Sequence, residues 1–136
     1  MSEMNKDLYR QYVDGFMRRG DEAVADRIVD ENVVSHDALP GQPVGREGLK
    51  AAFRQLRGAF PDLAPELKDL VAEGDRVVAR FVVTGTHTGD FLGMPPTGKT
   101  FSYDEITIVR FENGRIVEHW AEMDSLGMMQ QLGVLG

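Results

Sequence analysis

Two long segments rich in Val, Phe and Thr, residues 76–88 and 100–112, most constrain how this chain can fold. Their length and residue types predict long β-strands. Tight hairpin turns are expected at residues 73–75 (Glu-Gly-Asp), before the first segment, and at Asn113–Gly114, after the second. Shorter strands are expected on the far side of each turn, at residues 65–72 and 115–124. The second half of the chain therefore predicts an antiparallel meander.

The first half of the chain carries helical periodicity instead. Apolar residues recur at three- and four-residue steps over residues 8–17 and again over residues 49–60, which predicts two amphipathic helices. A short helix between them is expected at residues 21–28, followed by an extended piece at residues 32–36. After residue 125 the tail is expected to form a turn of helix.

This order of elements predicts an α+β fold, in which a curved antiparallel sheet wraps around the N-terminal helices. A meander can bury one face against helices and leave its other face free. A strongly twisted sheet of this kind forms a cone, and the open end of a cone is a natural small-molecule pocket. No repeat or linker divides the sequence, so we expect a single domain over residues 1–136.

Charge and composition exclude several classes of function. The formal net charge is −7, and no basic cluster provides the cationic surface that a nucleic-acid partner requires. No apolar run approaches the ~18 residues of a membrane span, so no membrane association is expected. The sequence contains no cysteine, and its N-terminal residues lack the apolar core of a secretory signal. We therefore expect a cytoplasmic protein.

Three stretches of the sequence carry a family resemblance: residues 34–36 (Val-Ser-His), residues 85–99 (Gly-Thr-His-Thr-Gly-Asp-Phe-Leu-Gly-Met-Pro-Pro-Thr-Gly-Lys) and residues 110–124 (Arg-Phe-Glu-Asn-Gly-Arg-Ile-Val-Glu-His-Trp-Ala-Glu-Met-Asp). Together with the tail at residues 131–133, they resemble the SnoaL-like polyketide cyclase and ester cyclase family of the nuclear transport factor 2-like superfamily. The resemblance implies a cone-shaped, cystatin-like α+β barrel that pairs as a homodimer through its outer sheet face. It also implies ring closure by intramolecular aldol condensation, without metal, cofactor or covalent intermediate.

The family's acid/base aspartate near the end of the last strand matches Asp124. Aldol closure needs a base at the carbon next to a carbonyl and an acid for the new alkoxide, and one carboxyl with a raised pKa can serve both roles. Trp120 has the same parity as Asp124, so it is expected to provide an apolar wall beside it. The structural alternative is that Asp124 caps a terminal helix beginning at Ser125.

Two further carboxylates share the parity of Asp124. Glu118 or Glu122 could be the base, or could raise the pKa of Asp124, and both could instead be hydrated residues at the rim or in a dimer contact. His119 has the opposite parity and is expected on the outer face, in a subunit interface.

Arg80 lies in the middle of an otherwise apolar strand segment, where an isolated guanidinium would be costly to bury. It could pair with Asp124 or Glu118, or bind a substrate oxygen. The structural alternative is an ion pair with Asp104 or Glu105 across the sheet.

His36 and His87 are expected near the pocket mouth. His36 ends a short strand beside a loop rich in Gly and Pro, where it could hydrogen-bond a substrate carbonyl or share protons with Asp124. His87 stands at a strand end. Because the three histidines show no metal-binding spacing, we expect no metal site, and no serine lies in a nucleophile elbow.

One departure from the family pattern concerns the strand at residues 101–110. Polyketide cyclases of this family can use a histidine there beside the aspartate, and this strand has none. Tyr103, Asp104 or Arg110 would have to replace it, or the role is absent. This departure weakens the case for polyketide cyclisation more than the case for the pocket.

The leading hypothesis is a cyclase or isomerase with Asp124 as acid/base and with Arg80 and His36 orienting a hydrophobic, polyketide-like or ketone substrate. The expected apolar walls are Phe53, Phe60, Met94, Phe101 and Trp120. One alternative is a non-catalytic, ligand-binding dimer. Another is an epoxide or ester hydrolase of the same fold, in which Asp124, Glu118 and Arg80 would hold a water.

Overall fold

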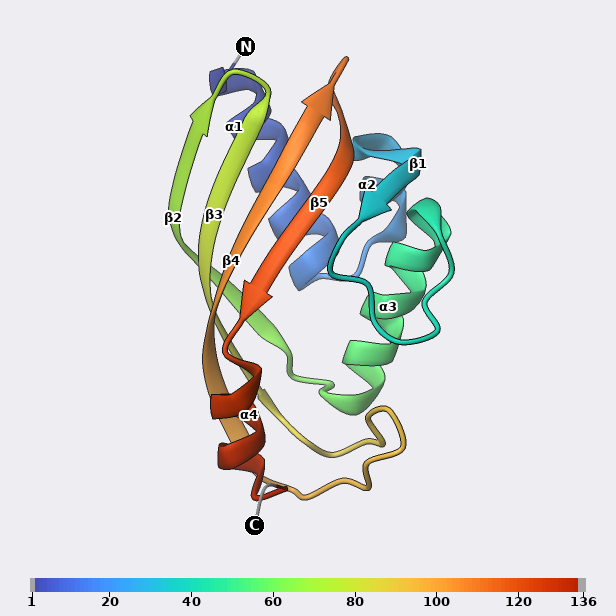
Figure 1. The fold of residues 1–136 in the computed structure, drawn as a ribbon, viewed down its shortest axis with the longest axis vertical. Coiled ribbons are helices and arrows are strands. Elements are labelled where there is room, and N and C mark those ends of the chain that lie inside the picture. Colours follow the sequence, from blue (N-terminus) through green and yellow to red (C-terminus); the bar gives the residue numbers. More distant parts are fainter. Residues whose placement is uncertain (1, 135–136) are drawn as a thin grey trace.

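The computed structural model describes residues 2–134 and shows a curved five-stranded sheet with helices along its concave side (Figure 1). The elements in chain order are α1 (Ser2–Tyr12), η1 (Val13–Arg18), α2 (Glu22–Ile28), β1 (Val29–Ser35), α3 (Gly45–Ala59), β2 (Ala64–Glu73), β3 (Arg76–Thr86), β4 (Thr100–Glu112), β5 (Arg115–Met123) and α4 (Ser125–Leu132). The α+β fold with a cone-like sheet is therefore confirmed.

The strands lie in the order β1-β5-β4-β3-β2. From β2 to β5 they form the expected antiparallel meander. At the last hairpin, Asn113 and Gly114 have φ angles of +51° and +76°, as a two-residue hairpin turn of the favoured twist requires. β1 pairs in parallel with β5 at the far edge of the sheet, and the meander pattern alone does not predict this pairing.

The first helix continues into a π-helical turn, η1. Its wider turn lets Tyr12, Val13, Phe16 and Met17 all face the core, where each is at most 6% exposed. The Arg57 guanidinium of α3 donates to the Phe16 and Met17 carbonyl oxygens. The Phe16 oxygen also accepts from the Gly20 N–H, so the cation adds to the backbone hydrogen bonds at the end of the helix.

Strict alternation in β3 and β4 separates the two faces of the sheet. In β3 the concave-side residues Val77, Ala79 and Phe81 are at most 1% exposed. Across the β3–β4 ladder Phe81 pairs with Glu105, which places a carboxyl on the buried, concave face. A register shift after Arg110 then changes the phase between β4 and β5.

α4 closes the described chain beside the lower half of β4 (Figure 1). The Gln131 side chain donates to the Ser102 carbonyl oxygen at 2.8 Å and accepts from its N–H at 2.7 Å. Gly133 ends the helix with a φ of +76°. No helix within residues 2–134 is both long and apolar enough to cross a membrane.

Candidate active site

Glu105 of β4 places an acid on the concave face. Its neighbours two residues away on the same strand, Tyr103 and Thr107, are buried, and Phe81 lies opposite it on β3. Burial disfavours the ionised carboxylate and raises the pKa of Glu105 from 4.5 to about 7. The nearby His119 lowers this pKa and Asp37 raises it, each by less than burial does. A carboxyl of this kind can exchange protons near neutral pH.

His119 of β5 faces the same concave side and is only 9% exposed. Its Nδ1 lies 2.7 Å from Asp37 Oδ1 in the loop after β1. The parallel β1–β5 ladder explains this contact, because Ser35 pairs with His119 and the His36 N–H donates to the His119 carbonyl oxygen at 2.9 Å. The expectation that His119 lies on the outer face is therefore wrong.

Buried phenols from α1 and β4 lie near the site. The hydroxyls of Tyr9 and Thr107 lie 2.9 Å apart and join α1 to β4. Burial raises the pKa values of Tyr9, Tyr12 and Tyr103 further above the ordinary value of 10.0. These groups therefore stay protonated at any physiological pH.

Solvent reaches the concave face at one end of β4 and β5. Glu105 and Ala121 are partly exposed there, although residues further along both strands are buried. Met123, which pairs with Glu105, is 39% exposed, and Leu126 of α4 is 62% exposed. The open end of the site therefore carries the apolar side chain of Met123, which suits a hydrophobic substrate.

Most of the expected wall residues do lie on the inner side. Phe60, Phe101 and Tyr103 are buried, and the Phe101 and Tyr103 rings stack with centroids 5.6 Å apart. Phe53 and Met94 are partly buried against the same core. Phe60, Phe101 and Tyr103 form one aromatic wall, because the Phe60 and Phe101 rings also lie 4.9 Å apart, whereas the Phe53 ring packs on Phe16.

His87 is fully buried behind this wall. Its ring packs on Phe60 with centroids 5.6 Å apart, and its Nδ1 accepts from the Thr97 N–H at 3.3 Å. The other ring nitrogen, Nε2, is buried without a hydrogen-bond partner among the described residues. His87 thus ties down the loop between β3 and β4 and does not lie at the mouth of the site.

Asp124 lies at the end of β5, outside the concave site. Its exposed carboxylate accepts from the Gly127 N–H at 2.9 Å and caps α4. Trp120, which was expected to shield it, lies on the convex face. The geometry is that of the helix cap, and it does not support the catalytic role expected for Asp124.

Arg80 also faces outward and is not a lone buried charge. Its Nε lies 2.6 Å from Asp69 Oδ2 on the neighbouring strand β2, which is a different partner from the four carboxylates considered from the sequence. Glu122 is exposed opposite Ile106. The cluster of Asp124, Glu118 and Arg80 that a hydrolase would need is not assembled.

His36, Glu118 and Trp120 form a network on the convex face. His36 Nε2 lies 2.7 Å from Glu118 Oε2, and the Arg110 Nε donates to the other Glu118 oxygen at 3.0 Å. The His36 and Trp120 rings stack at 4.9 Å, and the Arg76 guanidinium lies 5.1 Å from the Trp120 ring centre. Hydrogen bonds from His36 and then Arg110 hold the pKa of Glu118 below its ordinary value.

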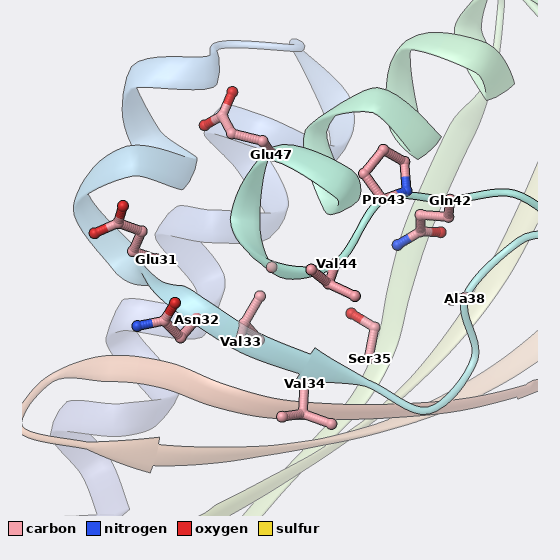
Figure 2. Close-up of a pocket in the computed structure, with 11 residues that line it drawn as sticks. Glu31, Asn32, Val33, Val34, Ser35, Ala38, Gln42, Pro43, Val44 and Glu47 are labelled. Carbon is pink, nitrogen blue, oxygen red and sulfur yellow. The ribbon is translucent and has the colours of Figure 1, made fainter.

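A separate hollow of about 430 Å³ lies between β1 and the start of α3 (Figure 2). The Ser35 hydroxyl points into it and has no hydrogen-bond partner among the described residues. Its rim includes the exposed side chains of Val34 and Val44. Within residues 2–134 no group of three His, Cys, Asp or Glu side chains is arranged to hold a metal ion.

Glu105, His119 and Asp37 were not predicted as site residues from the sequence. A signal for Glu105 was present, because it shares the parity of Phe101, which was predicted as a wall residue. No local pattern marks Asp37, because its contact with His119 depends on the parallel pairing of β1.

Comparisons with a family model, with curated proteins and with solved structures point to the same family. The sequence model for the SnoaL-like polyketide cyclase matches residues 6–132. Aklanonic acid methyl ester cyclase DauD of Streptomyces sp. (strain C5) is 34% identical over 131 residues, which is 93% of this chain and 80% of the relative. The solved structure of TsrD from Streptomyces laurentii is 34% identical with a TM-score of 0.86, covering 96% of both chains. IdmH from Streptomyces antibioticus is 34% identical with a TM-score of 0.81, covering 95% of this chain and 98% of its own.

Proposed function

Because the chain belongs to the SnoaL-like polyketide cyclase family, we propose that it closes a ring in a polyketide methyl ester by an intramolecular aldol reaction. Two arguments support this substrate class. Relatives such as DauD are named as cyclases of aklanonic acid methyl ester. The stacked aromatic wall of Phe101 and Tyr103 and the apolar rim at Met123 also suit a flat, hydrophobic molecule.

The observation that carries the proposal is the Glu105 carboxyl on the concave face with a pKa of about 7. Aldol closure transfers two protons: one leaves the carbon that becomes the nucleophile, and one reaches the oxygen of the attacked ketone. An acid/base group works best when its pKa lies near the operating pH. Glu105 meets this requirement without a cofactor, because the surrounding side chains set its pKa.

The test compares Glu105→Gln with Asp124→Asn, using aklanonic acid methyl ester as substrate. Each change removes one carboxylate and keeps its shape. We expect Glu105→Gln to lower kcat by on the order of 10²- to 10⁴-fold, which is the usual contribution of an acid/base group. Asp124→Asn should keep kcat within about threefold, because Asn also caps helices well.

The opposite pattern, with Asp124→Asn inactive and Glu105→Gln active, would return the acid/base role to the last strand. Wild-type protein that binds the ester without closing the ring would favour the non-catalytic alternative.

We also propose that the protein forms a homodimer through the convex face of the sheet. Val71 and Ile106 are 60% and 49% exposed on that face, and Val78, Ile108 and Trp120 lie in register across β3, β4 and β5. The ion pairs of Arg80 and Arg110 flank these apolar residues. An apolar centre with a charged border is typical of a subunit interface.

A further inference from the structure

A second group that can transfer protons, His119, faces the concave site from β5, the strand next to that of Glu105. The His119 ring is almost fully buried, and its Nδ1 is held 2.7 Å from the Asp37 carboxylate. A carboxylate can only accept, so Nδ1 carries the proton in this pair. In a neutral imidazole Nε2 then carries the lone pair, and no hydrogen bond among residues 2–134 occupies it. His119 is thus oriented as a base.

The two groups lie on the same face of the sheet, and His119 is near enough to Glu105 to lower the pKa of that carboxyl. His119 pairs with Val109, which is four residues from Glu105 along β4, or roughly 13 Å of strand. The inward residues between them are Thr107 and Ala121, which form a cross-strand pair. Ala121 is small and partly exposed, whereas Thr107 is buried and its hydroxyl lies 2.9 Å from the Tyr9 hydroxyl. The floor between the acid and the histidine is therefore open on the Ala121 side.

The charges around the pair distinguish the two roles. The pKa of Glu105 is affected by the charges of His119 and Asp37, and its carboxyl lies among the neutral phenols of Tyr9 and Tyr103. His119, in contrast, has the Asp37 carboxylate in direct contact. A carboxylate at Nδ1 stabilises the positive charge that an imidazole gains when it takes a proton. Burial favours the protonated form of Glu105, which is the form that can donate a proton.

We propose that His119 is the catalytic base, that Glu105 is the catalytic acid and that Asp37 is the positioning residue for His119. This division of roles rests on the proposed aldol cyclisation. His119 Nε2 removes a proton from the carbon next to the ester carbonyl, and that carbon forms the new C–C bond to the ketone carbon. The ketone C=O π bond opens, and its oxygen takes the proton of Glu105. Proton exchange with water then returns His119 and Glu105 to their starting forms.

The test separates the first half of the reaction from the second. In D₂O, aklanonic acid methyl ester is followed by NMR for deuterium uptake next to its ester carbonyl and, separately, for ring closure. We expect Glu105→Gln to keep deuterium uptake within about fivefold of the wild-type rate while losing ring closure. His119→Gln should lose both activities, by on the order of 10²-fold or more.

His119→Asn guards against a simple loss of structure, because its side-chain N–H can still donate to Asp37 while the basic Nε2 is absent. It should fold like the wild type by near-UV circular dichroism and still lack deuterium uptake. Asp37→Asn should lower kcat for deuterium uptake by on the order of 10²- to 10⁴-fold with KM changed by less than about threefold, because Asn disfavours the required tautomer. Asp37→Glu should recover part of that loss.

Deuterium uptake that survives in His119→Asn and disappears in Glu105→Gln overturns this division of roles and leaves Glu105 as the sole acid/base of a working cyclase. Asp37→Asn with wild-type kcat overturns the positioning role. Failure of the wild-type protein to exchange or close the ester at all overturns the proposed function itself, and the three failures are therefore distinguishable.

Discussion

The Glu105 carboxyl lowers the free energy of unfolding near and above neutral pH, which is also the range in which it can transfer protons. Its folded pKa of about 7 lies above the ordinary value of 4.5, because the folded protein favours the protonated carboxyl. Its contribution to stability is therefore fully present below about pH 4.5 and is lost as the pH rises through about 7. Above pH 7 the folded chain holds a partly desolvated carboxylate. Such a cost is common where an active site needs a group in an unfavourable setting.

We therefore expect Glu105→Gln to raise the free energy of unfolding at pH 8.5 by about 2–3 kcal/mol, since each pKa unit corresponds to about 1.4 kcal/mol. At pH 4.5 or below the difference should be close to zero. Urea unfolding followed by the fluorescence of Trp120, the single tryptophan, measures both values. The matched control is Asp104→Asn, whose exposed side chain lies next to Glu105 in sequence but on the convex face. Equal gains for both variants would contradict the account.

The site was only partly predictable residue by residue. The apolar pattern predicts Phe60 and Phe101 in the wall, and both lie on the buried face. The acid was sought on the last strand, where Glu118, Trp120 and Asp124 share one parity. In the structure, Glu118 and Trp120 lie on the convex face of the sheet. The phase depends on the register shift after Arg110, which the alternation within one strand does not reveal.

At the scale of elements the sequence was a better guide. The helices, the hairpin turns and the four strands of the meander follow from periodicity and from turn residues such as Asn113 and Gly114. The parallel pairing of β1 is a long-range contact without a local signal. The π-helical turn at residues 13–18 is contacted by Arg57 from a distant helix, and the periodicity of residues 8–17 alone predicts an ordinary helix.

The loop between β3 and β4 is fastened to the end of α3, and one glycine makes this possible. The N–H groups of Thr88 and Gly89 both donate to the Ala59 carbonyl oxygen, at 3.1 and 3.0 Å. A Cβ at Gly89 would lie 2.1 Å from the Gly58 carbonyl oxygen, which is backbone and cannot turn away. We expect Gly89→Ala to destabilise the protein by about 1–3 kcal/mol in thermal unfolding.

Gly58→Ala is the matched control on the other side of this contact. Its Cβ would meet nothing within 4 Å, and the residue is exposed in helix α3. Alanine favours a helix over glycine, so we expect a stabilisation of about 0.5–1 kcal/mol. Equal losses in the two variants would mean that the loop is not held by this close approach.

At the scale of the whole molecule, the curved sheet gives its two faces different tasks. The concave face holds the acid, the histidine and the aromatic wall, whereas the convex face carries apolar residues among ion pairs. Membership of the SnoaL-like polyketide cyclase family and the α+β cone agree with what the sequence predicted. The single domain over residues 1–136 stays a prediction.

We expect Ile106→Lys to dissociate the proposed dimer, because it places a charge at the centre of the convex face. Size-exclusion chromatography with light scattering should show a monomer at concentrations where the wild type is a dimer. Val44→Lys makes the same chemical change at a residue that is 95% exposed beside α3, and it should leave the dimer intact. Dimers of the same stability in both variants would show that the convex face is not the interface.

The proposed function depends on a Glu105 carboxyl whose pKa lies near 7, so that it can transfer protons inside the cone. A ¹³C NMR titration of the glutamate carboxyl carbons tests this most directly, with the Glu105 resonance identified by its absence in Glu105→Gln. We expect a midpoint of about 7 for this resonance. A midpoint near the ordinary value of 4.5 would contradict it, because the carboxyl would then be as solvated and as weak a proton carrier as any surface glutamate.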